Sequence, residues 1–276
     1  MSAPMHGGFF EGIDWSRPWL APFRVLAGEI IREPDWRSAL NERAAAMELK
    51  NHRGLPIRFV PQSDLPPGTA YEAFISATGG VPTRSNLHDF FNALVWLTFP
   101  KIKVRLNALQ AAEIEKNPAA PPGQERHGAV RGKLRDAATI FDENAALLVV
   151  REQTLIDAFR EHQWQDMFIT RRENFFRDCD VWLFGHALME KLVHPYKAIT
   201  AHAWPLIADN AFFGQSAAGR RVWLDGTVSE QLAAGFQTSC FTPLPVLGIP
   251  RWWDAQDAPY YADRAVFRPK RKLPGR

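Results

Sequence analysis

RSNLHDFFNALVWLTFP, residues 84–100, predicts a helix that is apolar on nearly every side. Ser85 or Asn86 can cap its first turn, and Pro100 is expected to stop it because proline is disruptive inside a helix. A helix without a polar face belongs in the interior of a protein. We therefore expect this segment to be buried.

Three polar side chains, His88, Asp89 and Asn92, lie in the first turns of this helix. Buried polar groups need hydrogen-bond partners, so three adjacent ones indicate a built site, structural or functional. His88 and Asn92 are four residues apart and share a helix face. The helix N-terminus favours a phosphate or carboxylate, which Asp89 opposes unless a metal ion or Arg84 offsets its charge. In the structural alternative, Asn86 and Asp89 cap the helix and His88 donates to a carbonyl.

The composition is that of a globular protein with a substantial core. Of 276 residues, 46% are hydrophobic and 23% charged, and the 10 tryptophans and 19 phenylalanines argue against disorder. A formal charge of +3 does not by itself indicate nucleic-acid binding. Cys179 and Cys240 make no disulfide framework. Residues 1–14 lack a signal-peptide pattern and no apolar run approaches the roughly 20 residues of a bilayer span, so we expect a cytoplasmic protein without a membrane partner.

The order of helical and strand-like segments predicts an α+β fold. We expect a mainly helical single domain over residues 1–268, with a small β-hairpin or sheet. An irregular aromatic and proline-rich C-terminal cover is expected from Phe241, followed by a basic tail at 269–276. Residues 117–128 form the clearest exposed loop. Further expected helices follow Asp35 and cover residues 69–76, 101–115, 154–168 and 175–194, and expected strands cover 59–60, 134–141, 147–150 and 221–224.

A second chemical segment is residues 135–144, RDAATIFDEN, which is predicted as a strand followed by a polar turn. Arg135 and Asp136 then point to opposite faces of the strand. Asp142, Glu143 and Asn144 offer several oxygen ligands close together. The same three residues are also typical of an ordinary turn, because Asp and Asn side chains form hydrogen bonds with their own backbone in turns.

A third segment, residues 184–202, carries His186, Glu190 and His202. On the helix predicted here, His186 and Glu190 are four residues apart, so both can reach one metal ion or each other. The structural alternative is an ion pair or a histidine oriented by a glutamate. Gly185 inside a helix is unfavourable and predicts close approach by another backbone, such as that of the 84–100 helix.

Several common reaction classes have no signature in this sequence. It contains no glycine-rich phosphate loop and no Gly-x-Ser-x-Gly elbow, which argues against P-loop and acyl-transfer chemistry. The basic run at 268–276 can contact phosphates, or it can be a solvated tail.

Together, the three segments resemble the bacterial family catalogued as domain of unknown function 3025. The motifs that carry the resemblance are residues 86–96 with Phe99-Pro100 and 103–107, Arg135-Asp136 with 141–144, 184–188 with Glu190-Lys191, Pro195-Tyr196-Lys197 with 200–202, and 247–250 with Trp252-Trp253. The resemblance implies no particular reaction. Gly79-Gly80 followed by Asn86-Leu87 is more distantly similar to HNH-type nucleases, but residues 74–76, Phe-Ile-Ser, stand where the general-base histidine is expected.

The first functional hypothesis is an enzyme whose buried polar site is shared by these three segments. It is a hydrolase of a phosphorylated or acidic substrate, acting through a divalent metal or by general acid–base catalysis. The candidate catalytic residues are His88, Asp89, Asn92, His186, Glu190 and His202. The candidate substrate-binding residues are Arg135, Asp136 and Lys197. The candidate metal ligands are Asp142, Glu143, His186 and Glu190.

The second hypothesis is a binding or scaffold protein in which each histidine is fully paired and the polar cluster is structural. A third is nucleic-acid binding through the basic tail, or an HNH-like nuclease. The three differ in one observable: the enzyme requires His88, His186 and His202 to converge beside an open pocket.

Overall fold

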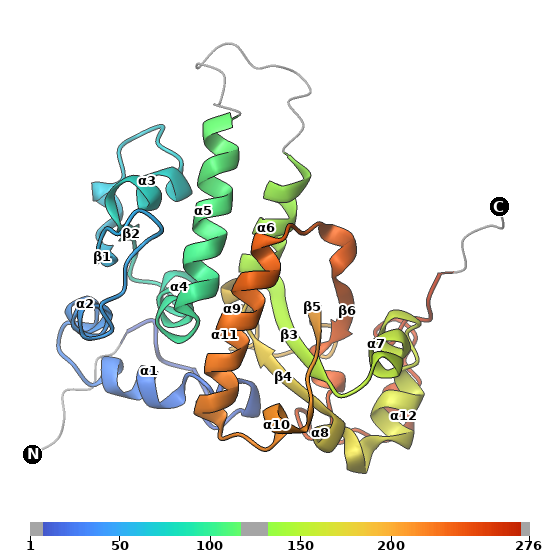
Figure 1. The fold of residues 1–276 in the computed structure, drawn as a ribbon. Helices are drawn as coiled ribbons and strands as arrows, with labels where there is room; N and C mark the ends of the chain where they lie inside the picture. Colours follow the sequence, from blue (N-terminus) through green and yellow to red (C-terminus); the bar gives the residue numbers. More distant parts are fainter. Residues whose placement is uncertain (1–7, 117–131, 272–276) are drawn as a thin grey trace, which may run out of the picture.

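The computed structural model describes residues 8–116 and 132–271, and it is organised around a four-stranded sheet with the order β4-β3-β5-β6 (Figure 1). β3 runs parallel to β5 and antiparallel to β4, and β6 is antiparallel to β5. The strands are β3 (Ala145–Val150), β4 (Cys179–Leu183), β5 (Thr200–Ile207) and β6 (Thr242–Pro245). The predicted α+β class, mainly helical with a small sheet, is confirmed.

Helices cover this sheet on both sides. All six residues of β3 are buried, as expected for a strand packed on both faces. In Figure 1, α5 and α11 stand on one side of the sheet, and α7 and α12 on the other. The bounds of these helices are α5 (Pro100–Lys116), α11 (Ala217–Ala233), α7 (Gln153–Arg160) and α12 (Ala258–Tyr261).

Helix α4 (Leu87–Thr98) is the helix predicted from residues 84–100. The Asn86 side chain caps it by accepting a hydrogen bond from the backbone N–H of Asp89 at 2.8 Å. Every residue from Asp89 to Thr98 is buried, which confirms that the helix belongs to the interior. Pro100 ends α4 and begins α5, because proline is well tolerated in a first helical turn.

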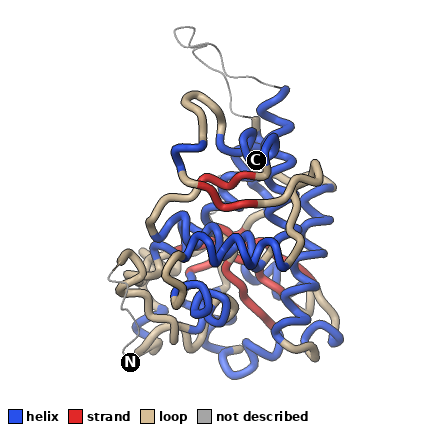
Figure 2. Tube along the Cα trace, turned by 90° about the vertical axis from the view of Figure 1, so that its left-hand side faces the viewer, coloured by secondary structure: helices blue, strands red, loops and turns tan. Residues whose placement is uncertain are grey.

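A second, two-stranded sheet lies beside α3. Its strands β1 (Arg58–Val60) and β2 (Gly80–Pro82) are parallel, and α3 (Tyr71–Thr78) lies between them in sequence. Gly79 ends α3 with a φ of 76°, and a Cβ at this position would lie 2.2 Å from the carbonyl oxygen of Pro56. Figure 2 shows this pair of strands separated from the larger sheet.

The remaining helices are short or peripheral. Asp35 caps the helix predicted to follow it, by accepting from the backbone N–H groups of Arg37 and Ser38. The other α-helices are α1 (Arg24–Ile31), α2 (Trp36–Ala46), α6 (Lys133–Asn144), α8 (Phe175–Asp178), α9 (His186–Lys191) and α10 (Asn210–Phe213). Single turns of 3-10 or π helix cover Pro18–Leu20, Gln62–Asp64, Asp166–Thr170, Arg172–Asn174, Thr238–Cys240 and Val246–Gly248.

The strand and turn predicted over residues 134–144 are wrong, because this segment is helix α6. Its buried residues Ala137, Ala138 and Phe141 have the spacing of one helix face. Asp142 and Glu143 therefore lie in the last turn of a helix. The chain passes directly from Asn144 into β3, which confirms the strand predicted at 147–150.

Three other predicted elements are also corrected. The single helix expected over 175–194 is divided into α8, β4 and α9, because the short apolar run in β4 suits a buried strand as well as a helix. The helix expected over 154–168 ends at Arg160 in α7. The strand expected at 221–224 is part of helix α11.

The C-terminal cover is present as predicted. Tyr261 and Phe267 are buried and pack on Phe168, and Trp252 packs on Trp19. The loop expected at 117–128 and the last five residues of the tail lie outside the described residues. Within 8–116 and 132–271, no helix has both the length and the apolar character needed to cross a bilayer. The single-domain boundary at residue 268 stays a prediction.

Candidate functional site

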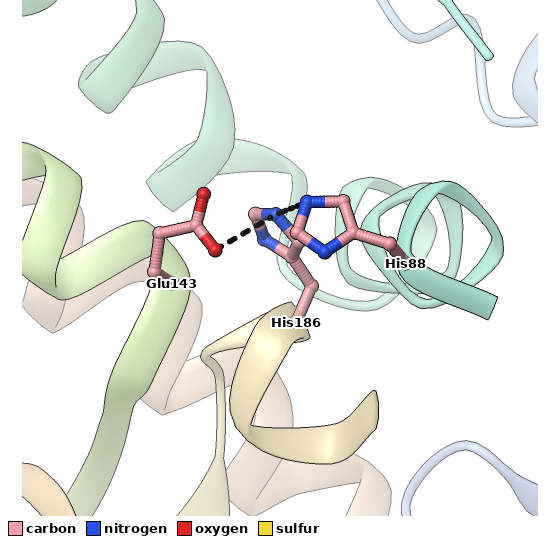
Figure 3. A group of neighbouring side chains, drawn as sticks. All are labelled: His88, Glu143 and His186. Carbon is pink, nitrogen blue, oxygen red and sulfur yellow. Dashed lines mark hydrogen bonds and ion pairs between the residues drawn. The ribbon is translucent and has the colours of Figure 1, made fainter. Parts of the chain in front are cut away.

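Three helices bring His88, Glu143 and His186 to one point (Figure 3). His88 lies at the start of α4, Glu143 in the last turn of α6, and His186 at the start of α9. The two imidazoles face each other with their Nε2 atoms 3.1 Å apart. Glu143 Oε2 lies 3.6 Å from His186 Nε2, and one ligand atom from each residue lies within 4.8 Å of the others. These three residues are named the triad below.

Gly185 sets the distance between α9 and α6. A Cβ on Gly185 would lie 2.5 Å from both Asn144 N and Glu143 O, so only glycine permits this approach. The backbone N–H groups of Phe184 and Gly185 both donate to the carbonyl of Ala145, at 3.0 and 2.8 Å. The expected close approach is therefore real, but its partner is the junction of α6 and β3 rather than α4. It holds His186 next to Glu143.

Glu190 orients His88 from the last residues of α9. Glu190 Oε2 accepts from His88 Nδ1 at 2.9 Å, and the two side chains are 40% and 30% exposed. The four-residue spacing allows Glu190 and His186 to reach one metal ion or each other; in the structure, Glu190 pairs with His88 on a different helix. A carboxylate on Nδ1 leaves Nε2 of His88 turned toward the centre of the triad.

His186 is the buried member of the triad. Burial lowers its pKa to about 4, against the opposing effect of the Asp142 carboxylate, so its ring is neutral at pH 7. Its Nδ1 atom is fully buried and lies near the backbone carbonyl of Asp142, outside the geometry of an ordinary hydrogen bond. Buried polar atoms without a partner are uncommon in folded proteins.

Glu143 in the triad and Asp142 beside it have opposite pKa shifts. Burial and the neighbouring Asp142 charge raise the pKa of Glu143. Burial also acts to raise the pKa of Asp142, but the Lys103 ammonium and the neighbouring histidines together outweigh it, and the net shift is downward. A raised carboxyl pKa marks a place where a nearby positive charge would be favourable.

Lys103, Asp142, Asn92 and Tyr71 form a second polar cluster, named the Lys103 network below. Lys103 of α5 is only 4% exposed, and its Nζ donates to Asp142 Oδ1 at 2.6 Å and Asn92 Oδ1 at 2.8 Å. It also lies 5.3 Å from the centre of the Trp96 ring. The Asn92 amide then donates to the Tyr71 hydroxyl oxygen at 3.0 Å. The network ties α3, α4, α5 and α6 together.

Arg84 neutralises Asp89, as the sequence suggested. Its backbone N–H, Nε and Nη2 donate to the Asp89 carboxylate at 2.6, 2.9 and 3.0 Å. Asp89 is buried, while the Arg84 side chain is 57% exposed. The charge that Asp89 places at the N-terminus of α4 is therefore paired.

A pocket of about 310 Å³ opens beside both clusters. It is lined by the triad, by Asp142, Asn92 and Tyr71, and by the Arg84–Asp89 pair. The other lining residues are Gln62, Leu65, Glu72, Pro82, Gln110 and Thr139. A larger groove of about 570 Å³ lies between α2 and β1, but no histidine or cysteine lines it. Convergent titratable groups identify the smaller pocket as the candidate site.

The triad fits a divalent metal ion. Two tetrahedral ligands about 2.0–2.1 Å from a zinc ion lie about 3.3 Å apart, close to the 3.1 and 3.6 Å separations found here. Two imidazoles and one carboxylate are a donor set of catalytic zinc sites and of non-haem iron sites. Glu190 stands where metal-binding histidines usually have a carboxylate on the second ring nitrogen.

The structure thus brings together seven of the residues predicted from the sequence: His88, Asp89, Asn92, Asp142, Glu143, His186 and Glu190. Four others lie elsewhere. His202 lies on β5, exposed and against Phe241, and does not line the pocket. Lys197 pairs with Asp263 at 2.8 Å, under the C-terminal cover. Arg135 and Asp136 lie in the first turns of α6, away from the pocket lining.

The sequence did not identify Lys103 and Tyr71 as site residues. Lys103 is one of three basic positions, with Lys101 and Arg105, in the helix predicted at 101–115, and Tyr71 lies in the helix predicted at 69–76. The available signal was that Lys103 lies within the motif at 103–107 and is flanked by Ile102 and Val104. A lysine between apolar residues next to a buried helix is a candidate for a buried charge, which requires a partner.

Comparison with known proteins identifies the family and nothing more specific. No curated protein and no solved structure matches the chain. The family model described as "Protein of unknown function (DUF3025)" matches residues 57–271, a range that includes every residue of the triad and of the Lys103 network. The chain belongs to the DUF3025 family.

Proposed function

We propose that this protein is a metal-dependent hydrolase in which His88, His186 and Glu143 hold one divalent ion, zinc in the first instance. The observation that carries the proposal is the convergence of two Nε2 atoms and one carboxylate oxygen, at 3.1 and 3.6 Å, beside an open pocket. This deepens the sequence-based hypothesis: His88, absent from the expected ligands, joins them, whereas Asp142 and Glu190 take supporting positions.

The proton inventory of the triad supports a cation at its centre. If Glu190 accepts the Nδ1 proton of a neutral His88, then His88 Nε2 can only accept. His186 Nε2 must then donate to it, which leaves a buried lone pair on His186 Nδ1, the atom near the Asp142 backbone carbonyl. A metal ion held by the triad would remove this conflict, because both rings could then carry their proton on Nδ1, next to the Glu190 carboxylate and the Asp142 carbonyl.

The charges around the pocket support the same conclusion. Asp89 is paired with Arg84 and Asp142 with Lys103. Among the described residues, Glu143 and Glu190 form ion pairs only with histidines, which must be neutral to bind a metal. Two carboxylate charges are therefore left for a divalent cation to balance.

Three protein ligands would leave part of the coordination sphere of the ion open, and the chemistry that the ion would supply is the activation of water as a nucleophile at neutral pH. The chain's own groups supply the rest of the chemistry. Glu190 holds the His88 ring in one orientation, and Asp142 holds Lys103 in place behind the pocket. With these charges fixed before substrate arrives, the site needs little reorganisation during reaction.

We propose a small acidic or phosphorylated molecule as substrate. The pocket volume of about 310 Å³ suits a small molecule. Lys197 and Arg135, the cations expected to hold the anionic group, do not line the pocket. Arg84 lines the pocket. Its exposed guanidinium donates hydrogen bonds to Asp89 through Nε and Nη2, so Nη1 can bind an anion.

Metal binding tests this proposal first. We expect one equivalent of zinc per chain by elemental analysis and by isothermal titration of the chelator-treated protein. His186→Ala and Glu143→Gln should abolish that binding, while His202→Ala, outside the pocket, should retain it. Absence of binding, or binding that the first two variants retain, would overturn the metal site. Bound iron in place of zinc would redirect the proposal from hydrolysis to oxidation.

Hydrolysis is tested separately with the zinc-loaded protein. We expect turnover of p-nitrophenyl phosphate or p-nitrophenyl acetate that chelation and Glu143→Gln both remove. Metal binding without turnover of either probe would favour the binding-protein alternative. Nucleic-acid binding through the tail stays a separate prediction: it requires salt-sensitive affinity that disappears when residues after Phe267 are removed.

A further inference from the structure

Tyr71 stands at the pocket with one hydrogen-bonding direction unused. It is the first residue of α3, and its side chain lines the pocket beside Asn92. Its hydroxyl oxygen accepts a hydrogen bond from Asn92 Nδ2 at 3.0 Å. Among the described residues, no carbonyl or carboxylate accepts the Tyr71 hydroxyl proton. A phenol has one proton to donate, and here the pocket is the open direction.

The orientation of the Asn92 amide, on which this depends, is fixed by Lys103. An ammonium group can only donate, so the Asn92 atom that faces it at 2.8 Å must be the oxygen. The amide nitrogen must then face Tyr71, and a flipped amide would place its NH₂ against Lys103. Asp142 and the Trp96 ring hold Lys103 in this position. The Lys103 network thus keeps the Tyr71 oxygen as an acceptor on the Asn92 side.

The surroundings also keep the Tyr71 hydroxyl protonated. Burial and the nearby charges of Asp142 and Asp89 raise its pKa above the ordinary value of a tyrosine. Its hydroxyl is therefore a permanent donor at neutral pH. Since Asn92 and His88 are one helical turn apart on α4, this donor lies on the same wall of the pocket as the triad.

We propose that Tyr71 donates a hydrogen bond to an oxygen atom of the substrate bound at the triad, the carbonyl or phosphoryl oxygen on which negative charge develops during hydrolysis. This inference rests on the proposed metal-dependent hydrolysis and adds a hydrogen-bond donor that is separate from the three metal ligands. It restricts the substrate to molecules whose reacting group carries such an oxygen. Donors fixed in place before reaction are the most effective stabilisers of a developing oxyanion.

Cobalt-loaded protein and inorganic phosphate test the role of Tyr71. The visible absorption of bound Co²⁺ reports both metal loading and phosphate binding. We expect Tyr71→Phe to bind Co²⁺ as the wild type does but to bind phosphate about tenfold to a hundredfold more weakly, the effect of losing one hydrogen bond to a charged group. Tyr260→Phe is the matched control, because Tyr260 donates to the Leu247 carbonyl away from the pocket.

Each outcome decides a different claim. Failure of the wild type to bind Co²⁺ would overturn the metal site and this inference with it. Normal Co²⁺ binding with equal phosphate affinity in Tyr71→Phe would overturn the role of Tyr71 alone. Loss of both Co²⁺ and phosphate binding in Tyr71→Phe would assign Tyr71 a structural role and also overturn the inference.

A second measurement leaves the side chain in place. The chain has four tyrosines, so ¹⁹F spectra of zinc-loaded protein labelled with 3-fluorotyrosine contain few resonances. Phosphate should shift the Tyr71 resonance and leave that of Tyr260 unchanged. Assignment by Phe variants of the other three tyrosines makes this test independent of whether Tyr71→Phe folds. A Tyr71 resonance that does not respond to phosphate would contradict the proposal.

Discussion

The two polar clusters that meet at the pocket are built from the same kinds of side chain, yet they are satisfied to different degrees. In the Lys103 network, the ammonium lies between a carboxylate and an amide, and every member has a hydrogen-bond partner inside the network. In the triad, two imidazole nitrogens face each other at 3.1 Å, a carboxylate has a raised pKa, and His186 Nδ1 makes no hydrogen bond of ordinary geometry with a described residue. The charges of the first cluster are balanced without a ligand. In the proposed function, the second cluster is completed by a cation.

The difference shows how a fully paired buried cluster can hold an incompletely paired one in place next to it. Buried charges are strongly unfavourable unless they are paired, so the paired network can hold helices together without a ligand. An incomplete cluster reduces stability and persists where surrounding structure holds it in place. Here Asp142 and Glu143 are adjacent residues, and each belongs to a different cluster. The network therefore positions the triad through one turn of α6.

Lys103→Met should give the largest effect on the fold itself. It leaves the carboxylate of Asp142 in a buried place without its cation, which should lower the free energy of unfolding by about 3–5 kcal/mol. Urea unfolding followed by tryptophan fluorescence measures this. Lys191→Met, at an exposed lysine, is the control and should change little. A loss under 1 kcal/mol for Lys103→Met would show that the network is not structural.

The double variant Lys103→Met/Asp142→Asn sharpens the same comparison. Removing the second charge should recover part of the lost stability, because the buried carboxylate is then gone. Strictly additive effects in the double variant would contradict the ion pair.

Gly185→Ala should disturb the triad through the backbone. Its Cβ would lie 2.5–2.6 Å from three backbone atoms of residues 143–145, so α9 must move away from α6. We expect a loss of about 1–3 kcal/mol in unfolding free energy and weaker zinc binding. The matched control is Gly226→Ala in the middle of α11, where a Cβ meets nothing within 4 Å. That variant should gain about 1 kcal/mol. Equal effects at the two glycines would contradict the role of Gly185.

Glu190→Gln should affect the metal rather than the fold. Loss of the carboxylate on His88 Nδ1 should weaken zinc binding about tenfold to a hundredfold, with little change in urea unfolding of the metal-free protein. Glu72→Gln, which lines the same pocket without contacting a histidine of the triad, should bind zinc within a few-fold of the wild type. Equal weakening of zinc binding in the two variants would show that Glu190 acts only through its negative charge and not by orienting His88.

His202 should show the smallest effect, because it lies outside both clusters. Burial, followed by the nearby Lys191 charge, lowers its pKa below the ordinary value. Its folded pKa is therefore below its unfolded pKa, and its contribution to stability is present above the unfolded value and is lost as the pH falls through the folded one. NMR titration of the ring protons should show this lowered pKa, and zinc should leave the His202 signal unshifted. A shift comparable to that of His88 would place His202 at the site after all.

Much of the candidate site was predictable because its residues lie near helix ends with strong local signals. The Asn86 cap and the all-apolar sequence that follows predicted both α4 and the burial of Asp89 and Asn92. The four-residue spacing of His186 and Glu190 predicted a helix where α9 lies. Most of the longer helix predicted around it, over residues 175–194, was wrong. An apolar run as short as residues 181–183 is compatible with both a strand and a helix. The division into α8, β4 and α9 could therefore not be predicted from the local sequence.

The partners within the site were not predictable from spacing, because they depend on packing between distant segments. Glu190 faces His88 only because α9 crosses α4, and His202 is excluded only because β5 directs it toward Phe241. Nothing in the sequence around His202 distinguishes it from the other two histidines. The register of β5 against β3, which places His202 opposite Ala145, makes that distinction.

The direct junction between α6 and β3 has a consequence for the unfolding of the protein. Glu143 is two residues from the first residue of the central strand, while His88 and His186 lie on helices distant in the sequence. An ion held by all three would act as a non-covalent cross-link that closes two long chain segments at once. Its binding would stabilise the folded state, β3 included, by an amount that grows with the logarithm of the free ion concentration above Kd. Zinc should therefore slow hydrogen exchange most in β3, at the centre of the molecule, rather than in the more exposed residues that line the pocket.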